Sequence, residues 1–464
     1  MTKNDLTGTI IENIIVEGFA SDGKCIIKYN NKVGLISKVA PGDLIDAKII
    51  KDYKNYFDAI AINIKKNSSY RVDPRCPHYN ICGGCRWQHL DYPYQLLAKH
   101  AQVEDAFFKI LHMKNCVPPV APSNKIFYYR NKLEYSFTDK RWIYNYEAYE
   151  DTNKDLRALG YHVPERFDRI FNVEECHLMD LFHNKIRNQV NEICKSLNIP
   201  YYNRKTQEGI LRALIIRNNR AGNWMVIIVI AEYNSTIEKL LKQLIELFPN
   251  ISWNYAISKR LNDSTDGLEA INVYGDKFLT EIIDDFKFRI SPFSFFQINP
   301  DQSEIIYRKM IEISEITYNE VAWDLYCGTG TIALFAAKQA KKVIGIESVP
   351  QAIVAARENA KSNNINNVEF ITGDVDKIVS TAEITKPDII FLDPPRSGLN
   401  KKIIENINII KPKTIIYLSC NAATQARDIS LLLDNYSISF TQPYDMFPQT
   451  AHVENLVKLS LKNQ

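Results

Sequence analysis

Residues 321–331 read Val-Ala-Trp-Asp-Leu-Tyr-Cys-Gly-Thr-Gly-Thr, an apolar run that leads into a glycine-rich turn. A segment with helical spacing of apolar residues follows at once, so the stretch predicts a buried strand, a tight turn and a helix. Gly328 and Gly330 allow the backbone to approach a ligand closely, and Thr331 opens the helix. Such a unit holds a nucleotide cofactor in doubly wound α/β sheets.

The sequence from residue 290 onward continues this pattern. Strand-like runs at 343–347, 368–374, 388–393 and 414–419 alternate with helical ones, which predicts a parallel β-α-β sheet. Glu347 ends the next strand and is placed to accept hydrogen bonds from a ribose diol. Gly328, Gly330 and Ala333 also satisfy the loose G-x-G-x-x-A pattern of dinucleotide sites, so the loop alone leaves a nicotinamide cofactor open.

Further polar residues follow or precede strands of the same sheet. Asp393 and Cys420 come directly after consecutive predicted strands, whose carboxyl ends form the ligand-binding edge of an open α/β sheet. Cys420 is a candidate nucleophile, although a lone Cys is more often a small buried apolar residue. His452 and Glu454 precede a final strand at 455–461. Antiparallel pairing of that strand would bring them close to Cys420.

A second cluster of chemistry-bearing residues lies near the N-terminus. Cys76, Cys82 and Cys85 stand within ten residues, a density of soft ligands that indicates a metal centre. Zinc, with His78 as a further ligand, and an iron–sulfur cluster both fit this composition. The spacing C-x5-C-x2-C is uncommon for zinc ribbons and favours iron–sulfur. The fourth ligand must come from elsewhere, and the candidates are Cys116, Cys176 and Cys194.

Residues 7–66 form short β-rich runs separated by turn residues, and we expect five strands in a small barrel. Barrels of this size commonly bind single-stranded nucleic acid. Lys51, Tyr53, Lys54 and Tyr56 interleave cations with rings on which bases can stack, but the same pattern fits a solvated edge strand. The middle of the chain is mixed α/β, with strands at 133–137, 209–218 and 224–231 and helices at 94–113 and 235–247.

Composition limits the alternatives. A chain of 464 residues with 45% hydrophobic residues is long enough for about three packed domains. The net charge of +3 excludes binding to polyanions by charge alone. The longest apolar run, 224–231, is far short of the roughly 20 residues that cross a bilayer, so no membrane association is expected. Nine Cys without a secretion signal predict free thiols in the reducing cytoplasm.

Several motifs together resemble one family, the S-adenosylmethionine-dependent RNA uracil-C5 methyltransferases. They are DLYCGTGT (324–331), VIGIE (343–347), FLDPPR (391–396), YLSCN (417–421) and FPQTAHVENLV (447–457), in matching order and spacing. Residues 129–137 and 295–299 are similar to the family's central-domain and cofactor-entry motifs. The resemblance covers essentially the whole chain, and the N-terminal strands look like the TRAM barrel of the bacterial ribosomal-RNA members.

The resemblance implies a domain plan. Residues 1–66 correspond to an RNA-binding TRAM-like barrel with an OB-like fold. Residues 71–93 and 117–289 correspond to a central α+β domain that carries a [4Fe–4S] cluster, with Cys176 as the fourth ligand beside Cys76, Cys82 and Cys85. Residues 94–116 and 290–464 correspond to a class I, Rossmann-like methyltransferase domain. No obligate protein partner is evident.

The resemblance also implies a reaction, the formation of 5-methyluridine in 23S ribosomal RNA. Uracil C5 is a poor nucleophile, so Cys420 adds to C6 first, and Glu454 later removes the C5 proton. Asp393 orients the uracil or the cofactor, and Pro395 stands where a cytosine enzyme is expected to carry its Cys. The residues expected to hold S-adenosylmethionine are Gln297, Tyr326, Gly328, Gly330, Thr331, Glu347, Asp374 and Asp393.

The uridine must leave its stack to reach Cys420, so we expect it to be flipped out of the RNA, with Phe295 or Phe296 filling the gap. Candidate phosphate contacts in the central domain are Arg130, Lys132, Arg212 and Arg217. Three alternatives stay open. They are a transfer-RNA uracil methyltransferase, an RNA-binding iron–sulfur protein with an inactive methyltransferase domain, and a nicotinamide oxidoreductase, in which the motifs around Asp393, Cys420 and Glu454 have no role.

Overall fold

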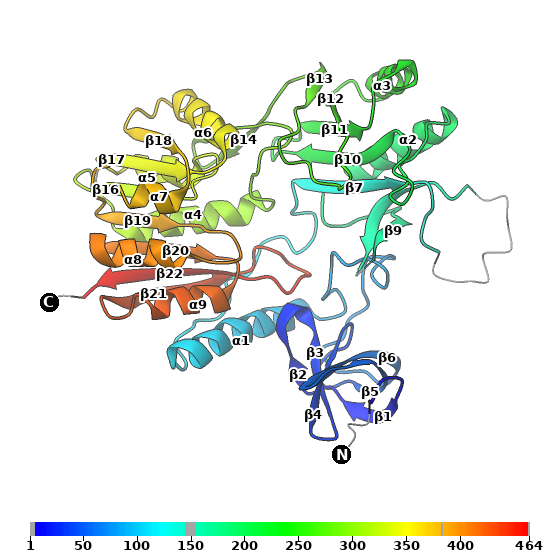
Figure 1. Cartoon of the computed structure of the whole chain (residues 1–464), viewed down its shortest axis with the longest axis horizontal. Coiled ribbons are helices and arrows are strands. Elements are labelled where there is room, and N and C mark those ends of the chain that lie inside the picture. The colour runs from blue at the N-terminus through cyan, green and yellow to red at the C-terminus, as the bar shows by residue number, and fades with distance from the viewer. Residues whose placement is uncertain (1–4, 144–154, 165, 382–383, 463–464) are drawn as a thin grey trace.

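The computed structural model describes residues 5–143, 155–164, 166–381 and 384–462. In this part of the chain the strands form one six-stranded sheet, two seven-stranded sheets and a hairpin. Figure 1 shows the C-terminal sheet with its helices on one side of the molecule, the central sheet beside it and the N-terminal sheet below. The molecule therefore consists of three units, each built around one large sheet, and we call them the N-terminal, central and C-terminal layers.

The N-terminal sheet is rolled around a small apolar core that includes Ile27, Ile45 and Phe57, which are fully buried. Its strands are β1 (Ile10–Ile15), β2 (Gly18–Phe19), β3 (Cys25–Tyr29), β4 (Lys32–Ile36), β5 (Leu44–Asp52) and β6 (Tyr56–Lys66), in the order β1-β5-β6-β4-β3-β2. β1 and β2 lie at opposite ends of that order although only two residues separate them, so the sheet must curl.

This region has six strands where the sequence predicts five, because the first β-rich run changes partner in its middle. The N–H of Val16 donates to the carbonyl of Asp43, next to β5, whereas the N–H of Glu17 donates to the carbonyl of Ile26 in β3. The run is thereby divided into β1, which pairs with β5, and β2, which pairs with β3.

The central sheet has the order β13-β12-β11-β10-β7-β8-β9, and β11 is buried along its whole length. Its elements are β7 (Lys132–Thr138), β8 (Ala158–Val163), β9 (Arg166–Asn172), α2 (Phe182–Ser196), β10 (Leu211–Asn218), β11 (Trp224–Ile230), α3 (Ser235–Leu247), β12 (Ile251–Ile257) and β13 (Ile271–Tyr274). The side chain of Asn234 accepts hydrogen bonds from the N–H groups of Thr236 and Ile237, which fixes the start of α3. The helix predicted at 235–247 is confirmed.

The C-terminal sheet has the order β18-β17-β16-β19-β20-β22-β21. Its elements are β16 (Val321–Leu325), α5 (Thr331–Ala337), β17 (Lys342–Glu347), α6 (Pro350–Ser362), β18 (Val368–Thr372), α7 (Val375–Val379), β19 (Ile389–Leu392), α8 (Lys401–Ile410), β20 (Thr414–Ser419), α9 (Ala422–Ser430), β21 (Tyr436–Tyr444) and β22 (Glu454–Leu461). The five strands β16 to β20 are parallel, and β22 pairs antiparallel with β20. The predicted β-α-β sheet is confirmed, and so is the antiparallel final strand.

Helices from other parts of the chain cover this sheet. α1 (Tyr92–Leu111) packs against α9, since Val103 and Phe107 share an apolar cluster with Ala422, Ala426 and Ile429. α4 (Pro300–Ser314) precedes β16, and the hairpin β14 (Leu279–Ile283) and β15 (Phe286–Ile290) contacts α6. The C-terminal layer therefore contains a helix from the first quarter of the chain (Figure 1).

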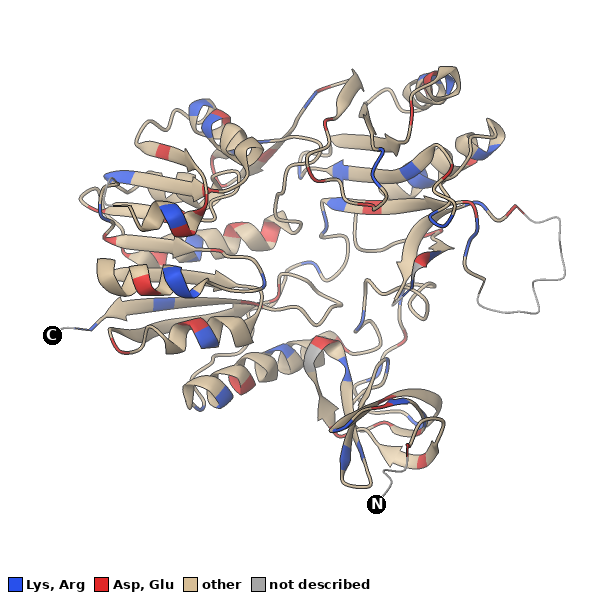
Figure 2. Cartoon of the chain, viewed as in Figure 1, with Lys and Arg blue, Asp and Glu red and all other residues tan. Residues whose placement is uncertain are grey.

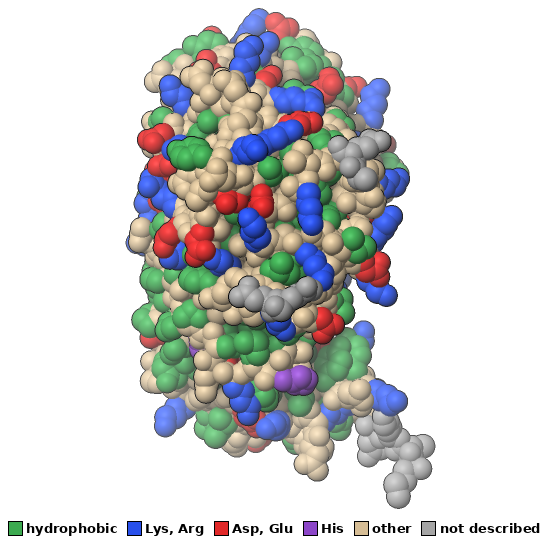
Figure 3. All heavy atoms as spheres, turned by 90° about the vertical axis from the view of Figure 1, so that its left-hand side faces the viewer, with side chains coloured by type: hydrophobic (Ala, Val, Ile, Leu, Met, Phe, Trp, Pro, Cys, Tyr) green, Lys and Arg blue, Asp and Glu red, His purple; other side chains and the backbone are tan. Residues whose placement is uncertain are grey.

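Charges of both signs are distributed over all three layers (Figure 2). The face in Figure 3 likewise mixes Lys and Arg with Asp and Glu, as the small net charge requires. Any polyanion must therefore be bound at local cationic sites.

Among the described residues, no helix combines the length and the apolar character that a membrane span needs.

Candidate functional site

Three strands of the C-terminal sheet deliver polar side chains to one edge. Ser419 pairs with Asn455 in the antiparallel ladder of β20 and β22, so the next position in register sets Cys420 opposite Glu454. Asp393 follows β19, which pairs with β20 on its other side. The structure thus brings together the three residues that the sequence predicts as catalytic.

Their protonation states depend on one another. Burial raises the pKa of Glu454 well above its ordinary value, and Asp393 adds to the rise. Burial also raises the pKa of Asp393 to about 7. The pKa of the Cys420 thiol is raised to about 11 by burial and then by Glu454 and Asp393, while Arg396 acts in the opposite direction. Arg396 therefore favours the anionic forms of Cys420 and Glu454.

Helix α9 holds the thiol and the acid in register. Asn421 caps the helix by accepting from the N–H groups of Ala423 and Thr424, so Cys420 sits between the end of β20 and the start of α9. The buried amide of Gln425 donates to the carbonyl of Asn455 at 2.9 Å, and the side-chain amide of Asn455 donates back to Gln425 at 2.8 Å. These paired amides fix β22 against α9 one residue beyond Glu454.

The loop 445–453, which joins β21 to Glu454, is held by α1. Lys99 and Asp445 form an ion pair with 2.5 Å between Nζ and Oδ1, and both side chains are completely buried. Gln95 accepts from the N–H of Gln449 and donates to its side-chain oxygen. No sequence signal indicates this clamp, because its partners lie about 350 residues apart, and the motif at 447–457 that contains Gln449 does not point to α1.

The glycine loop after β16 has the geometry of a cofactor cradle. Gly328 (φ 53°) and Gly330 (φ 82°) adopt left-handed backbone conformations, and a Cβ atom at Gly328 would meet nothing within 4 Å. Glu347 accepts from the N–H of Gly328 at 3.2 Å. The open space over the loop and the carboxylate at its rim fit the predicted nucleoside cofactor.

The other predicted cofactor residues lie around the same loop. Tyr326 adopts φ 66° directly before it, and its pKa is raised by burial and then by Asp376 and Asp374. Asp374 accepts from the N–H of Asp376 and so caps α7. Thr331 is the first residue of α5. Tyr326 and Asp374 therefore follow the carboxyl ends of β16 and β18.

Gln297 connects the cofactor region to the catalytic cluster. It lies close to Tyr307, whose pKa is raised well above its ordinary value by burial and then by Asp393, Asp324 and Glu454. The side-chain amide of Asn131, from the central layer, donates to the carbonyl of Gln297 at 2.9 Å. Tyr307 was not singled out from the sequence, because a Tyr in a helix pattern carries no signal of a site.

Two of the predicted phosphate contacts are wrong. Arg217 is buried and donates to the carbonyls of Ser291, Pro292 and Ser294, so it braces the loop that leads to Gln297. Arg212 is buried as well and donates to the carbonyls of Ser258 and Asn262. Both guanidinium groups are used to satisfy backbone oxygens inside the protein.

The remaining RNA candidates occupy different environments. Phe295 is 71% exposed, whereas Phe296 is buried, so of the two only Phe295 is free to stack on a base. Lys132 pairs with Glu134, and Arg130 lines a cavity in the central layer. On the N-terminal sheet, the rings of Tyr53 and Tyr56 stack at 4.5 Å between centroids, and Lys51 lies over Tyr53.

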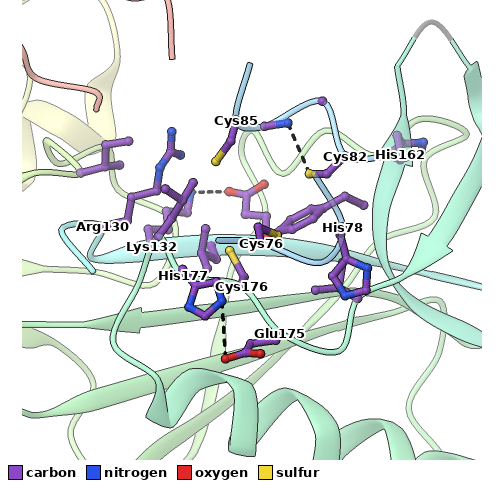
Figure 4. Close-up of a pocket in the computed structure, with 18 of the residues that line it drawn as sticks. Cys76, His78, Cys82, Cys85, Arg130, Lys132, His162, Glu175, Cys176 and His177 are labelled. Carbon is purple, nitrogen blue, oxygen red and sulfur yellow. Dashed lines mark hydrogen bonds and ion pairs between the residues drawn. The ribbon is translucent and has the colours of Figure 1, made fainter. Parts of the chain in front are cut away.

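The four predicted cluster cysteines line one cavity of about 480 Å³ (Figure 4). Three belong to the segment between the N-terminal sheet and α1, and Cys176 comes from the loop before α2. Burial raises the pKa of all four thiols, that of Cys82 to about 11 and that of Cys85 to about 12. For Cys76, Cys82 and Cys85, neighbouring thiols of the cavity add to the rise. The nine cysteines, all of them described, form no disulfide.

As the side chains stand, no group of three His, Cys, Asp or Glu within the described ranges converges closely enough to hold a single metal ion. Cys116 and Cys194, the other candidates for a fourth ligand, do not line the cavity. His78 does line it, and its Nε2 accepts from the N–H of Glu174. The thiols therefore surround a volume without meeting at one point.

Comparison with known proteins adds a family. A family model described as tRNA (Uracil-5-)-methyltransferase matches residues 268–462. A protein of Bacteroides thetaiotaomicron named "Uncharacterized RNA methyltransferase" is 40% identical over 455 residues, which cover 96% of this chain and all of the relative. A protein of the same name from Porphyromonas gingivalis is 37% identical and covers 96% of this chain and 98% of the relative.

One solved structure resembles the whole chain. It is Pyrococcus abyssi tRNA (uracil-54, C5)-methyltransferase in complex with S-adenosyl-L-homocysteine. Its TM-score is 0.75 at 28% identity, and the match covers 96% of this chain and 99% of that one. The likeness extends well beyond the C-terminal sheet.

Proposed function

This chain belongs to the family of RNA (uracil-5)-methyltransferases, and we propose from that premise that it forms 5-methyluridine in RNA with Cys420 as nucleophile and Glu454 as base. The observation that carries the proposal is the register of β20 and β22, which sets the thiol opposite the acid at one sheet edge. Asp393 follows the neighbouring strand at the same edge.

The first step is addition of the Cys420 thiolate to C6 of uracil. The new S–C6 bond moves the electron pair of the C5=C6 bond toward O4, and the resulting enolate is nucleophilic at C5. The resting thiol is protonated, since its pKa is raised to about 11, so its proton must pass to the solvent before the thiolate adds to C6. Arg396 is the nearby cation that stabilises the thiolate, and the start of α9 directly after Cys420 acts in the same direction.

S-adenosylmethionine, when bound, would supply the methyl group to C5 as a sulfonium, whose sulfur leaves as a neutral thioether. Glu454 then takes the proton from C5, the electron pair restores the C5=C6 bond and the Cys420 sulfur leaves. A carboxylate with a raised pKa accepts a proton more strongly than one in water, and Glu454 is held in such surroundings. Asp393, with its pKa raised to about 7, can donate a hydrogen bond to a uracil carbonyl when protonated.

Residues around the glycine loop would hold the cofactor. We assign its ribose to Glu347 at the end of β17, and its amino-acid portion to the side facing Gln297 and Asp393. The bound S-adenosyl-L-homocysteine of the Pyrococcus abyssi enzyme supports this cofactor over a nicotinamide. Gly328, Gly330, Thr331, Tyr326 and Asp374 complete the cradle.

We propose 23S ribosomal RNA as the substrate, because the N-terminal strands and the cysteine segment resemble the ribosomal-RNA members. Transfer RNA is the second candidate. The tRNA enzyme of Pyrococcus abyssi matches 96% of this chain, so the rolled N-terminal sheet also fits a tRNA substrate. In both cases the exposed Phe295 and the ring pair Tyr53–Tyr56 are suited to contact unstacked bases.

We also propose that Cys76, Cys82, Cys85 and Cys176 bind a [4Fe–4S] cluster. A single zinc ion needs four donors about 2.3 Å from one point. A cluster instead binds each thiolate through a different iron, which suits thiols that surround a cavity. Binding would also displace the protons of these buried thiols, and the irons would neutralise the negative charge of the resulting thiolates.

Nucleoside mass spectrometry tests the reaction and the substrate together. The protein is incubated with S-adenosylmethionine and unmodified ribosomal or transfer RNA in separate tubes, and 5-methyluridine is expected in the ribosomal tube. 5-Methyluridine formed only with transfer RNA would instead make transfer RNA the substrate.

Cys420→Ala should abolish the formation of 5-methyluridine while cofactor binding persists. Cys116→Ala, a change outside the site, should still form 5-methyluridine. Turnover by Cys420→Ala would exclude the nucleophile assignment, and cofactor binding without product in either tube would favour an inactive RNA-binding protein.

A further inference from the structure

A small hollow of about 90 Å³ lies beside the catalytic edge. Three segments that are distant in sequence meet there, since it is lined by Asp22, Gly83, Gly84, Arg86, Thr450, Ala451 and His452. The first belongs to the N-terminal layer, the next three to the cysteine segment and the last three to the loop that precedes Glu454. None of these residues has a role in the reaction described above.

The hollow presents a cation and a neutral donor, and a second cation lies beside it. Arg86 and His452 line the hollow, whereas Arg396 lies next to the lining, with its guanidinium 3.4 Å from Nδ1 of His452. Both arginines are exposed. Burial of the ring, aided by Arg396, Lys99 and Arg86, lowers the pKa of His452 to about 4, against a weaker effect of Asp22. The ring is therefore neutral, and with Nδ1 accepting from Arg396, its Nε2–H is available as a donor.

Asp22 does not neutralise this arrangement. Arg86 donates to the backbone carbonyl of Asp22, not to its carboxylate. Lys99 is buried and paired with Asp445, so it affects the hollow only by long-range electrostatics and not by direct contact. The exposed guanidinium of Arg86 in the lining, that of Arg396 beside it and one N–H donor remain for an anion of tetrahedral geometry, which is the chemistry of a phosphate site.

The hollow is also next to the reacting groups. Arg396 lowers the pKa of both Cys420 and Glu454, and His452 lies two residues before Glu454. A uridine that reaches Cys420 carries a phosphodiester on each side, and the chain's net charge of +3 provides no general attraction for them. A local anion site at this distance from the base would position the strand.

We propose that this hollow binds a phosphodiester of the RNA strand that carries the target uridine, held by Arg86, Arg396 and His452. The proposal rests on the proposed function and adds a binding site to it. Because Arg396 also stabilises the thiolate, it belongs to the catalytic machinery. Arg86 touches only the hollow and is the residue that tests the assignment.

The test is the salt dependence of RNA binding, measured by anisotropy with a labelled oligouridylate of about twenty nucleotides between roughly 50 and 200 mM salt. Every nucleotide of this probe can enter the uracil site, so register does not matter. Arg86→Gln should reduce the slope of log Kd against log salt by about 0.7 and weaken binding about fivefold at 0.1 M. Arg86→Lys keeps the charge and should keep the slope.

A purely structural role of Arg86, through its bond to Asp22, gives a different result. Arg86→Lys and Arg86→Gln would then weaken binding alike, with the slope unchanged, and the proposal would be overturned. Failure of the wild-type protein to bind oligouridylate would overturn it too. Arg289→Gln, which breaks a half-exposed ion pair with Glu358 elsewhere, is the matched control and should leave slope and affinity unchanged.

A second readout separates this inference from the proposed function. With an RNA that the wild-type protein methylates, Arg86→Gln should raise KM and leave kcat near the wild-type value. Absence of 5-methyluridine with every RNA would refute the proposed function, whereas the salt slope would still decide the anion site. An unchanged Tm of Arg86→Gln would show that the fold around Arg86 is kept.

Discussion

Replacing Lys99 by Met should strongly lower the free energy of unfolding of the C-terminal layer. The Lys99 ammonium lies 2.5 Å from Asp445, with both side chains fully buried, and it also donates to the carbonyl of Phe447 at 3.1 Å. Met fills a similar volume but leaves the carboxylate buried without its cation. Loss of one partner from a buried pair costs about 3–5 kcal/mol. For a domain of roughly 150–250 residues, a loss of this size lowers Tm by roughly 6–20 °C.

Calorimetry of four proteins tests this reasoning: wild type, Lys99→Met, Asp445→Asn and the double variant. The double variant should recover most of the loss, because no unpaired charge remains in it and the amide oxygen that replaces the carboxylate can still accept from the N–H of Phe447. Lys109→Met, on the exposed side of the same helix, should change the free energy of unfolding by less than about 0.5 kcal/mol. Additive losses in the double variant would refute the ion-pair explanation.

Three further predictions concern the site. Glu454→Gln should accumulate a covalent protein–RNA adduct on denaturing gels, because elimination needs the base, and clean turnover would contradict this role. Gly330→Ala should weaken cofactor binding at least about tenfold, since its Cβ would lie 2.8 Å from Phe370, whereas Gly222→Ala, with the same φ and open space, should not. Alkylation of Cys420 should accelerate with pH toward about 11. The midpoint of that curve should fall in Glu454→Gln, because a negative charge that raises the thiol pKa is removed, and an unshifted midpoint would show that Glu454 does not act on the thiol.

The sequence predicts the C-terminal sheet well because its signals are local. A strand, a turn that needs glycine and a helix follow one another within residues 321–337, and each has its own pattern. The expected closeness of Glu454 and Cys420 follows from a single assumption, antiparallel pairing of the last strand, and the ladder confirms that pairing as far as Ser419 and Asn455.

The roles of the buried cations could not be predicted in the same way. Arg217 has the sequence context of a strand residue, and its acceptors lie on a loop more than 70 residues away. Lys99 and Asp445 are separated by 346 residues. A charge looks like a surface residue until its partner is known, and partners at such separations leave no periodic signal.

Trp87 links the cysteine segment to the loop that precedes Glu454. Two residues after Cys85, Trp87 is fully buried, and its N–H donates to the carbonyl of Gln449. Its indole N–H donates to Gly23 in the N-terminal layer. The same Gln449 is held by Gln95, within the loop that ends at Glu454. These contacts would transmit order in the cysteine segment to the loop that precedes Glu454, so a cluster there would support the proposed reaction without transferring an electron.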